Sequence, residues 1–311
     1  MRRALLGTIA VGLAGFAALH VLLLLGVSRP VPLDWLWSFV PQLFLPAWLL
    51  LVGALVAGSR VLVAVATVVA AAHLAWVLPV TTGGGETVPA GAVELRVLSA
   101  NVFRDNPSLD AHLAEIRAAD ADLVVLQEVT LRDQPAIFEA LSVAYPSYTF
   151  MARDDAFGAA VFSRHPLVDE QIIDVAGLPM LTIGVDLGAV TARVWNVHTR
   201  APTLTGRRLL RDAQLDAMVD LRRFEHQPLL AAGDFNATYW NDAFADLLAT
   251  DLRDAHDVVG RGLTGTWKGV RVETLIDHVL LSPEWGVAAV RNGEGPGSDH
   301  RPVIADLFLR R

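Results

Sequence analysis

The sequence predicts an all-helical membrane segment followed by an α/β domain with two mixed sheets. First, 53% of the 311 residues are hydrophobic, only 19% are charged and the mean hydropathy is +0.42, which is too apolar for an ordinary soluble globular protein. Second, residues 1–80 hold four of the 25 basic and one of the 33 acidic side chains, which leaves 21 and 32, a net charge of −11, beyond residue 80. Third, short β-branched runs and amphipathic helical patterns follow that point.

Three runs without charged side chains at their centres make up the predicted membrane segment. We expect transmembrane helices at about residues 4–27, 41–57 and 61–79. A span needs roughly 20 apolar residues, and the second run is the shortest because Pro41 and Pro46 restrict its start. A cleaved signal peptide is the alternative for the first run, but the length of that run and the two runs after it favour a membrane helix. Indole rings prefer the interface, and four lie near the expected span ends, at Trp35, Trp37, Trp48 and Trp76.

Basic residues set the predicted orientation. Arg2 and Arg3 precede the first span and Arg60 lies between the second and third, whereas Arg29 and Asp34 balance each other in the remaining loop. The positive-inside rule therefore predicts a multi-pass protein of the cell membrane, with a cytoplasmic N-terminus and everything after residue 80 outside. If the second run only re-enters the bilayer, the later part lies inside instead.

A Gly- and Thr-rich linker at residues 81–92 is expected to lead into a soluble domain at residues 93–311. Strands are expected at residues 93–100, 123–127, 158–163, 181–187, 190–197, 229–232, 275–281 and 303–308. Amphipathic helices are expected at residues 109–119, 134–143, 206–224 and 240–249. Because many strands are near neighbours in sequence and long helices are few, we expect a mixed two-sheet body and not a doubly wound Rossmann sheet.

Polar side chains recur where the predicted apolar strands end. They are Asn101, Glu128, His198, Asp234 and Asn236. A rigid sheet positions such groups while they face its solvent edge, which is how a convergent site is built. Each residue taken singly has a structural reading as a turn residue or a helix cap. Their recurrence at the same kind of place favours a shared site.

Three more candidates lie near the C-terminus. Asp277 stands inside the apolar run LIDHVLLS, where an ionised carboxylate is costly without a partner, and Asp299 and His300 follow the loop GEGPG. The sequence has no cysteine, no HExxH spacing for zinc, no GxSxG nucleophile and no glycine-rich phosphate loop. An oxygen-rich set of Asn, Glu and Asp instead suits a hard cation, Mg²⁺ or Mn²⁺.

Seven motifs occur in order between about residues 93 and 308: SAN, LQEV, GAAVFSRHP, NVH, GDFN, LIDHVLLS and SDHRPV. In this order they resemble the endonuclease/exonuclease/phosphatase superfamily, whose fold is typified by deoxyribonuclease I. GDFN followed by IDH and SDH is the specific combination. The resemblance implies a four-layered α/β sandwich of two packed mixed β-sheets flanked by helices, and divalent-metal hydrolysis of phosphate esters. The N-terminal spans are not part of that family's core fold.

The resemblance also implies a metal site. Glu128 and Asn101 resemble the family's metal-binding residues, and Asp299 is a possible further ligand. Phosphoryl chemistry needs positioning, an in-line water and a cation for the accumulating negative charge, so Mg²⁺ or Mn²⁺ is the expected cofactor.

The remaining roles are implied in the same way. Asp234 resembles the acid that orients or deprotonates the attacking water, and Asn236 resembles the phosphate-binding amide. His300 is expected to contact the phosphate, with Asp277 holding its tautomer and favouring its protonated form. His198 matches the second histidine of the deoxyribonuclease-like members.

Parts of the family pattern have no clear counterpart. These are the glutamate that supports the histidine at the position of His198, for which Asp154 and Asp155 are weak candidates, and the active-site tyrosine of some nucleases. Thr266 and Trp267 lie where many members have a Thr-aromatic pair, and for Trp267 a core role and substrate stacking stay open. A structural or interfacial role is expected for His20 and His73, which lack an acidic partner in their spans. Structural or solvated roles are expected for His112, His165, His226, His256 and His278.

The first functional hypothesis is a membrane-anchored phosphoesterase whose substrate is a phospholipid head group, a small molecule or a nucleic acid. An extracytoplasmic nuclease is the alternative. A catalytically inactive binding module is disfavoured because every main motif acid and histidine is present. A domain of net charge −11 is a poor binder of polyanions, and a bilayer anchor raises the local concentration of membrane-borne substrates, so lipid head groups are favoured. No motif points to an obligate protein partner.

Overall fold

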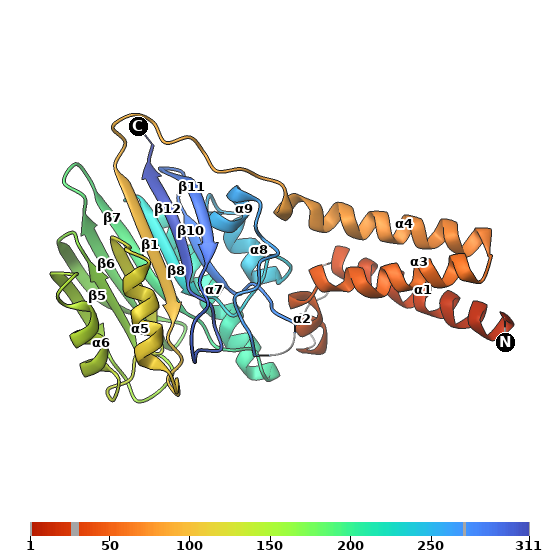
Figure 1. Cartoon of the computed structure of the whole chain (residues 1–311), viewed down its shortest axis with the longest axis horizontal. Helices are drawn as coiled ribbons and strands as arrows, with labels where there is room; N and C mark the ends of the chain where they lie inside the picture. The colour runs from red at the N-terminus through yellow and green to blue at the C-terminus, as the bar shows by residue number, and fades with distance from the viewer. Residues whose placement is uncertain (1, 26–30, 270–271, 311) are drawn as a thin grey trace.

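The computed structural model describes residues 2–25, 31–269 and 272–310, and places a rod of helices beside an α/β body (Figure 1). Arg29 and the last two residues of the first predicted span, 26 and 27, lie outside the described residues. The N-terminal part contains α1 (Arg2–Leu24), α2 (Val31–Ser38), the 3-10 turn η1 (Pro41–Leu43), α3 (Phe44–Val56), α4 (Arg60–Val77) and the 3-10 turn η2 (Leu78–Thr81). Helices α1, α3 and α4 pack on one another to form the rod, whereas α2 lies against the body.

The rod turns its apolar side chains outward. Within the described chain two helical stretches are long and apolar enough to cross a membrane, Arg2–Leu22 and Arg60–Thr81, and the stretch Pro41–Val56 is shorter. Only 17% of each long stretch is buried inside the protein, whereas a core helix of a soluble protein would be mostly covered. Helices therefore form at all three predicted positions, and two of them reach spanning length.

Two histidines meet inside the rod. His20 on α1 and His73 on α4 lie with Nε2 and Nδ1 3.1 Å apart, and Phe16 packs against both rings. Neither predicted span contains an acidic partner for its histidine. In the structure each imidazole instead has the other imidazole as its partner, on a neighbouring helix. The pair holds two helices together, in keeping with the structural role expected for both residues.

The body contains two six-stranded mixed sheets. The first has the order β11 (Trp285–Asn292), β12 (Val303–Leu309), β1 (Glu94–Asn101), β2 (Leu123–Gln127), β4 (Ala159–Ser163), β3 (Ser147–Met151). The second has the order β5 (Leu167–Val175), β6 (Leu178–Asp186), β7 (Thr191–His198), β8 (Leu229–Asp234), β10 (Asp277–Leu281), β9 (Arg253–Asp254). In each sheet one central pair is parallel, β1 with β2 and β7 with β8, and the other pairs are antiparallel.

Strand alternation makes the four layers. Along β1, Leu95 and Val97 point into the core between the sheets, while Leu98 and Ala100 point to the outer helices. The first sheet is covered by α5 (Leu109–Ala118) and α6 (Gln134–Leu141), and the second by α7 (Thr205–Phe224) and α8 (Asp242–Leu248). Both faces of each sheet are thus buried, and the predicted four-layered α/β sandwich is confirmed.

All eight predicted strands and four predicted body helices form, with shifted ends. Strands β3, β5, β9 and β11, helix α2 and the short helix α9 (Ala255–Val259) lie outside the predicted elements. Strand β5 was not predicted because it is an edge strand with five consecutive exposed residues, and its sequence therefore lacks the apolar alternation of a half-buried strand. Strand β11 contains Gly286 and a register shift after Val287, which breaks the period-two pattern.

The Gly- and Thr-rich segment after α4 is fastened to the body. Gly84 N donates to Val258 O at 3.1 Å, Glu86 N donates to Val287 O at 2.7 Å, and the Glu86 carboxylate pairs with Arg253 and Arg310. A Cβ atom at Gly85 would lie 2.0 Å from the carbonyl oxygen of Ala288, so the close approach requires glycine. The segment predicted as a linker therefore runs as a strap along the edge of the body.

Candidate active site

Register brings the predicted polar residues to one edge of the sandwich. Strands β7 and β8 are parallel and pair His198 with Asp234, and antiparallel β10 sets Asp277 opposite Asp234. In the other sheet, Asn101 ends β1 beside the end of β2, and Glu128 follows β2 directly. The two sheets pack face to face, so these ends meet.

Asp234 is the centre of the cluster. It is 2% exposed, and its Oδ2 atom lies 3.3 Å from Asn101 Nδ2, 3.6 Å from His198 Nε2 and 3.6 Å from His300 Nε2. Its Oδ1 atom accepts the backbone N–H of Asn236 at 2.9 Å. Burial raises the pKa of Asp234 to about 6, against the opposing attraction of the two histidines. A carboxylate with this pKa is ionised at neutral pH and can accept a proton there.

His300 is held by Asp277. The Nδ1 atom of His300 lies 2.8 Å from Asp277 Oδ2, and both residues are buried. Thr266 Oγ1 accepts the backbone N–H of Asp277 at 3.0 Å, which fixes the start of β10. Burial alone would lower the pKa of His300, but the charges of Asp277 and Asp234 outweigh it and raise the pKa to about 10. The ring is therefore a cation at neutral pH, with Nε2 turned toward Asp234.

His198 is held by a backbone group. Its Nδ1 atom lies 2.8 Å from the carbonyl oxygen of Ala156, and its Nε2 atom lies 3.6 Å from Asp234 Oδ2 and 3.8 Å from Glu128 Oε1. Of the two acids considered as its support, Asp155 is instead paired with Arg153, at 2.6 Å. The carbonyl does the orienting, which no side-chain motif could have indicated.

Oxygen atoms suited to a divalent cation gather beside Asp234. Glu128 Oε1 accepts from Asn101 Nδ2 at 3.1 Å, so this one amide bridges the carboxylates of Glu128 and Asp234. Carboxylates drawn together in a partly buried pocket fit a hard cation that neutralises them. The amide oxygen of Asn101 accepts the backbone N–H of Phe103 at 3.0 Å, so the amide has to turn before its oxygen can ligate. Asp299 Oδ1 lies 3.9 Å from His300 Nε2, at the rim.

A second donor set overlaps the first. One ligand atom each from Asp234, Asp277 and His300 lie within 4.8 Å of one another, in a fully buried group that could hold a metal ion. We favour the set around Glu128, because Asp277 already engages His300 and the raised pKa of His300 keeps that ring protonated, which opposes ligation.

Backbone strain marks the same place. Phe103, Glu128 and Asn236 have φ of 58°, 60° and 48°, in the left-handed region that non-glycine residues rarely adopt. Such conformations cost about 1–3 kcal/mol each and persist where the surroundings impose them, commonly at functional sites. At Asn236 the side-chain amide donates to Thr199 O at 3.1 Å, which fixes it at the edge of the pocket.

Most of the predicted site residues line one pocket of about 250 Å³. Six of the eight predicted site residues contribute to its wall: Glu128, His198, Asp234, Asn236, Asp299 and His300. Asn101 and Asp277 contact the lining carboxylate and histidine from behind. Trp267 also lines the pocket, with its indole N–H 3.3 Å from Asp299 Oδ2. Three lining residues, Trp35, Ser38 and Phe39, come from α2 and the residue after it, and the sequence analysis did not connect them with the site.

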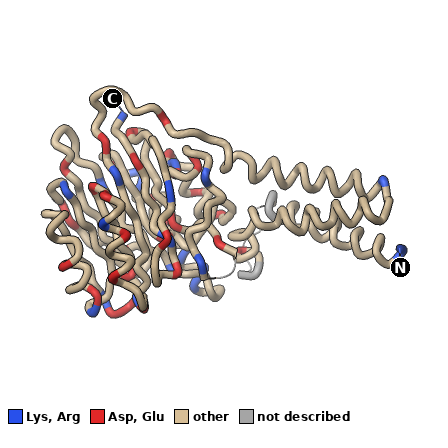
Figure 2. Tube along the Cα trace, in the orientation of Figure 1, with Lys and Arg blue, Asp and Glu red and all other residues tan. Residues whose placement is uncertain are grey.

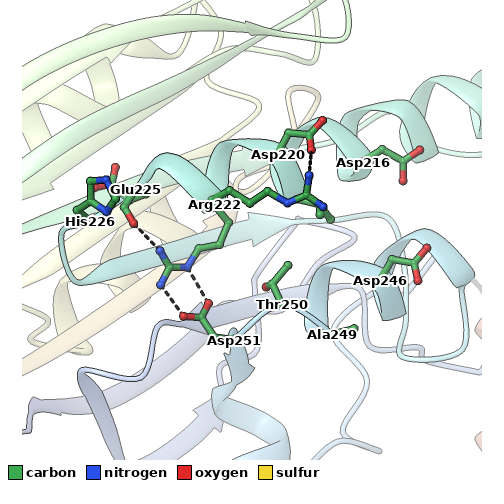
Figure 3. Close-up of a pocket in the computed structure, with 11 residues that line it drawn as sticks. Asp216, Asp220, Arg222, Glu225, His226, Asp246, Ala249, Thr250 and Asp251 are labelled. Atoms are coloured by element: carbon green, nitrogen blue, oxygen red, sulfur yellow. Dashed lines mark hydrogen bonds and ion pairs between the residues drawn. The ribbon is translucent and has the colours of Figure 1, made fainter.

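A larger hollow elsewhere does not share this chemistry. A groove of about 890 Å³ lies between α7 and α8, lined by acids and two arginines (Figure 3). Its arginines are already paired, Arg222 with Asp251 at 2.7 Å and Arg223 with Asp220 at 2.8 Å. It contains none of the eight predicted site residues.

Two packed mixed sheets flanked by helices, with acids and histidines gathered at one edge, define a four-layered α/β sandwich with a candidate active site. Residues 98–300 match the profile of the Endonuclease/Exonuclease/phosphatase family, and the chain belongs to this family. Its members are generally hydrolases that act on phosphate esters. No curated protein matched the sequence.

Solved structures share the fold. The endonuclease/exonuclease/phosphatase from Beutenbergia cavernae DSM 12333 is 23% identical, with a TM-score of 0.57 over 70% of this chain and 72% of that one. Humanized D. rerio TDP2 is 15% identical, with a TM-score of 0.61 over 70% of this chain and 100% of that one. D. rerio TDP2 complexed with single strand DNA product is 16% identical, with a TM-score of 0.58 over 69% of this chain and 98% of that one. At these identities the likeness shows the fold alone.

Proposed function

We propose that the protein is a membrane-anchored, divalent-metal-dependent phosphoesterase. The observation that carries this proposal is the convergence of Asp234, His300 and Glu128 in one pocket, in a family whose members generally hydrolyse phosphate esters. Glu128 and Asn101, with Asp299 as a further ligand, would hold Mg²⁺ or Mn²⁺, and the bound cation would neutralise negative charge at the phosphate.

The chain's own residues supply positioning and proton transfer. Asp234 accepts the proton of the attacking water, because its carboxylate is ionised and buried at the pocket floor. His300 donates from its protonated Nε2 to a phosphate oxygen as negative charge accumulates, and Asp277 keeps the ring oriented. The side-chain amide of Asn236 and the imidazole of His198, both at the edge of the second sheet, orient the phosphate.

We further propose that α1, α3 and α4 cross the cell membrane and that the body lies outside. Figure 2 shows basic residues at the end of the rod away from the body. Arg2 begins α1 and Arg60 begins α4, and Arg2 Nε donates to the carbonyl of Ala57, just after α3, at 3.2 Å. The positive-inside rule assigns that end to the cytoplasm. The 16 residues of Pro41–Val56 reach about 24 Å as a helix, so the bilayer is expected to thin or the polar ends to sit at head-group level.

Orientation can be tested by labelling, because the chain has no cysteine. Val143→Cys places a thiol on the body at a side chain 94% exposed, and Ser59→Cys places one at the far end of the rod. A membrane-impermeant maleimide is expected to label Val143→Cys in intact cells and Ser59→Cys only after lysis. The reverse pattern would place the body in the cytoplasm.

Catalysis is tested with the full chain in lipid nanodiscs and bis(4-nitrophenyl) phosphate. We expect turnover that requires Mg²⁺ or Mn²⁺, stops with EDTA and is lost in Asp234→Asn and His300→Gln. The matched control is His226→Gln, a histidine of the groove in Figure 3. Equal rates for the wild type and both site variants under every metal would refute the proposal and leave an inactive binding module.

A nuclease is the second candidate, because one structure of the same fold carries a single strand DNA product. The net charge of −11 beyond residue 80 opposes binding of a polyanion. We expect weak hydrolysis of a single-stranded oligonucleotide that falls steeply between 50 and about 200 mM salt. Strong cleavage that resists salt would favour the nuclease.

A further inference from the structure

The helix α2 is locked to the body by a buried ion pair. Asp34, the acid of the N-terminal segment, is 0% exposed, and its oxygens accept from Arg211 Nη2 at 2.7 Å and Nη1 at 3.0 Å. Asn241 Nδ2 donates to the same carboxylate at 2.9 Å. Arg211 also donates to the carbonyl of Asn236 at 3.2 Å, so the lock extends to the site itself. A buried, bidentate and fully bonded pair of this kind fixes position.

This lock makes α2 a wall of the active-site pocket. Trp35, Ser38 and Phe39 line the pocket that the acids and histidines also line. Trp35 Nε1 donates to Pro202 O at 3.1 Å, and Thr274 Oγ1 donates to Ser38 O at 2.6 Å, which pins both ends of the wall to pocket loops of the body. The site is thus built partly from the N-terminal segment.

The pocket lining combines two kinds of side chain. Carboxylates and imidazoles line it together with the apolar groups of Trp35, Phe39, Pro202 and Ile276. The chain passes from α2, which carries Trp35, to α3 of the rod over residues 39–43 alone. At the start of α3, Phe44, Leu45 and Trp48 are 48–55% exposed, as expected for side chains that meet lipid at the interface.

We infer that the site takes a phosphate ester that carries an apolar group and is presented by the bilayer, with the phosphate at Asp234 and His300 and the apolar group against Trp35 and Phe39. This inference rests on the proposed phosphoesterase function and adds its substrate class. A phosphate ester without an apolar group would leave the aromatic wall in contact with water, whereas an amphiphile buries it. Nucleobases can also stack on such rings, but the acidic body opposes their polyanionic chain.

The test uses two esters with the same reacting bond, methyl 4-nitrophenyl phosphate and octyl 4-nitrophenyl phosphate, and the full chain in nanodiscs. The readout is the ratio of kcat/KM for the octyl ester to that for the methyl ester, measured by release of 4-nitrophenolate. We expect a ratio of at least about 10 for the wild type, since each buried methylene favours binding. The double variant Trp35→Ala, Phe39→Ala is expected to lower that ratio to within about threefold of unity, because the wall is gone.

Two control variants remove an aromatic ring elsewhere. Trp48→Ala removes an exposed indole from α3, and Phe224→Ala removes a ring that is 79% exposed at the end of α7. Both are expected to keep the wild-type ratio, which separates the wall from membrane placement and from partition of the octyl ester into lipid. Folding of each variant is checked by its thermal unfolding midpoint.

Three results are distinguishable. Hydrolysis of neither ester with any metal would refute the proposed function itself. Hydrolysis of both esters with a ratio near unity, or with a ratio unchanged in the double variant, would overturn the inference and leave a phosphoesterase. If the double variant lost activity on a single-stranded oligonucleotide and kept the octyl preference, the wall would be a stacking surface for bases and the inference would be wrong.

Discussion

Two buried histidine–aspartate pairs lie back to back on strand β10. On one side of β10, Asp277 pairs with His300. His278, which follows Asp277 in the strand, points to the other side and contacts Asp254 Oδ2. Both histidines have a raised pKa, because a neighbouring carboxylate outweighs the burial that alone would lower it.

The pairs differ in what remains free. Both ring nitrogens of His278 are engaged, Nδ1 by Asp254 and Nε2 by the carbonyl of Ala237 at 2.9 Å, and the residue is 0% exposed. In His300, Nδ1 lies within hydrogen-bond distance of Asp277, whereas Nε2 lies 3.6 Å from Asp234 Oδ2 and faces the pocket. A buried histidine–aspartate pair therefore does not by itself distinguish a structural residue from a candidate catalytic one; a ring nitrogen that faces a pocket does.

The largest effect is expected at Asp234, the carboxylate that faces the His300–Asp277 pair. Asp234→Asn should lower kcat by about 10³–10⁴-fold, because the amide cannot accept the proton of water. It should leave the thermal midpoint equal or higher, since burial already disfavours the charged form of Asp234. Turnover of bis(4-nitrophenyl) phosphate and a melting curve in the same nanodiscs measure both, and a variant within tenfold of the wild type would exclude Asp234 as the base.

The two histidines can be compared by the same substitution. His300→Gln should lower kcat by about 10²–10³-fold, since a neutral amide replaces the cation that meets the phosphate. His278→Gln should change the activity of the folded protein less than threefold and lower its midpoint instead. Equal losses of activity in the two variants would erase the distinction drawn between the pairs.

The inner pair, formed by His278 and Asp254, should matter for the stability of the fold. Asp254 accepts hydrogen bonds from Tyr239 at 2.8 Å and from the backbone N–H of His256 at 3.0 Å, besides its contact with His278. Asp254→Ala leaves these groups buried without a partner and should lower the free energy of unfolding by about 3–5 kcal/mol. Denaturant unfolding of the full chain in detergent measures it; a loss below about 1 kcal/mol would mean that the inner pair is not structural.

The pH dependence of activity should distinguish the His300–Asp277 pair from the His278–Asp254 pair. Activity should rise as Asp234 loses its proton near pH 6 and fall as His300 loses its proton near pH 10. Asp277→Asn removes the negative charge that raises the pKa of His300, so the alkaline limb should move to lower pH by more than one unit. Profiles of kcat/KM from pH 5 to about 11 measure the shift; an unmoved alkaline limb would show that Asp277 does not act through His300.

The same His300 pair should also affect stability. Because its folded pKa of about 10 exceeds the ordinary value of 6.5, its contribution is fully present below pH 6.5 and is lost as pH rises through 10. In His300→Gln this part of the decline should be absent, as thermal midpoints across that range would show.

Strand-end chemistry explains why the convergence of the candidate site residues could be predicted. Asn101, His198 and Asp234 end predicted strands, and a carboxylate at Asp277 inside an apolar run implied a buried partner, which proved to be His300. The orienting carbonyl of Ala156 could not be predicted, because a backbone group has no sequence signature.

The contribution of α2 was missed for a different reason. In the sequence Asp34 balances Arg29 as a loop charge, whereas in the structure it pairs with Arg211 on α7. Contacts between such distant segments follow from tertiary packing and not from local periodicity. Trp35 was likewise assigned only to a membrane interface, and its place in the pocket became visible with that pairing.

The pairing of Asp34 with Arg211 also has a consequence for biogenesis. The two residues are 177 positions apart in the chain, so at about 5–20 residues per second Arg211 is synthesised roughly 9–35 s after Asp34. During that interval Asp34 lacks Arg211 as a partner, and an unpaired carboxylate prefers water to lipid. On the proposed membrane topology, Asp34 would thus keep α2 out of the bilayer until the body folds and completes both the ion pair and the pocket.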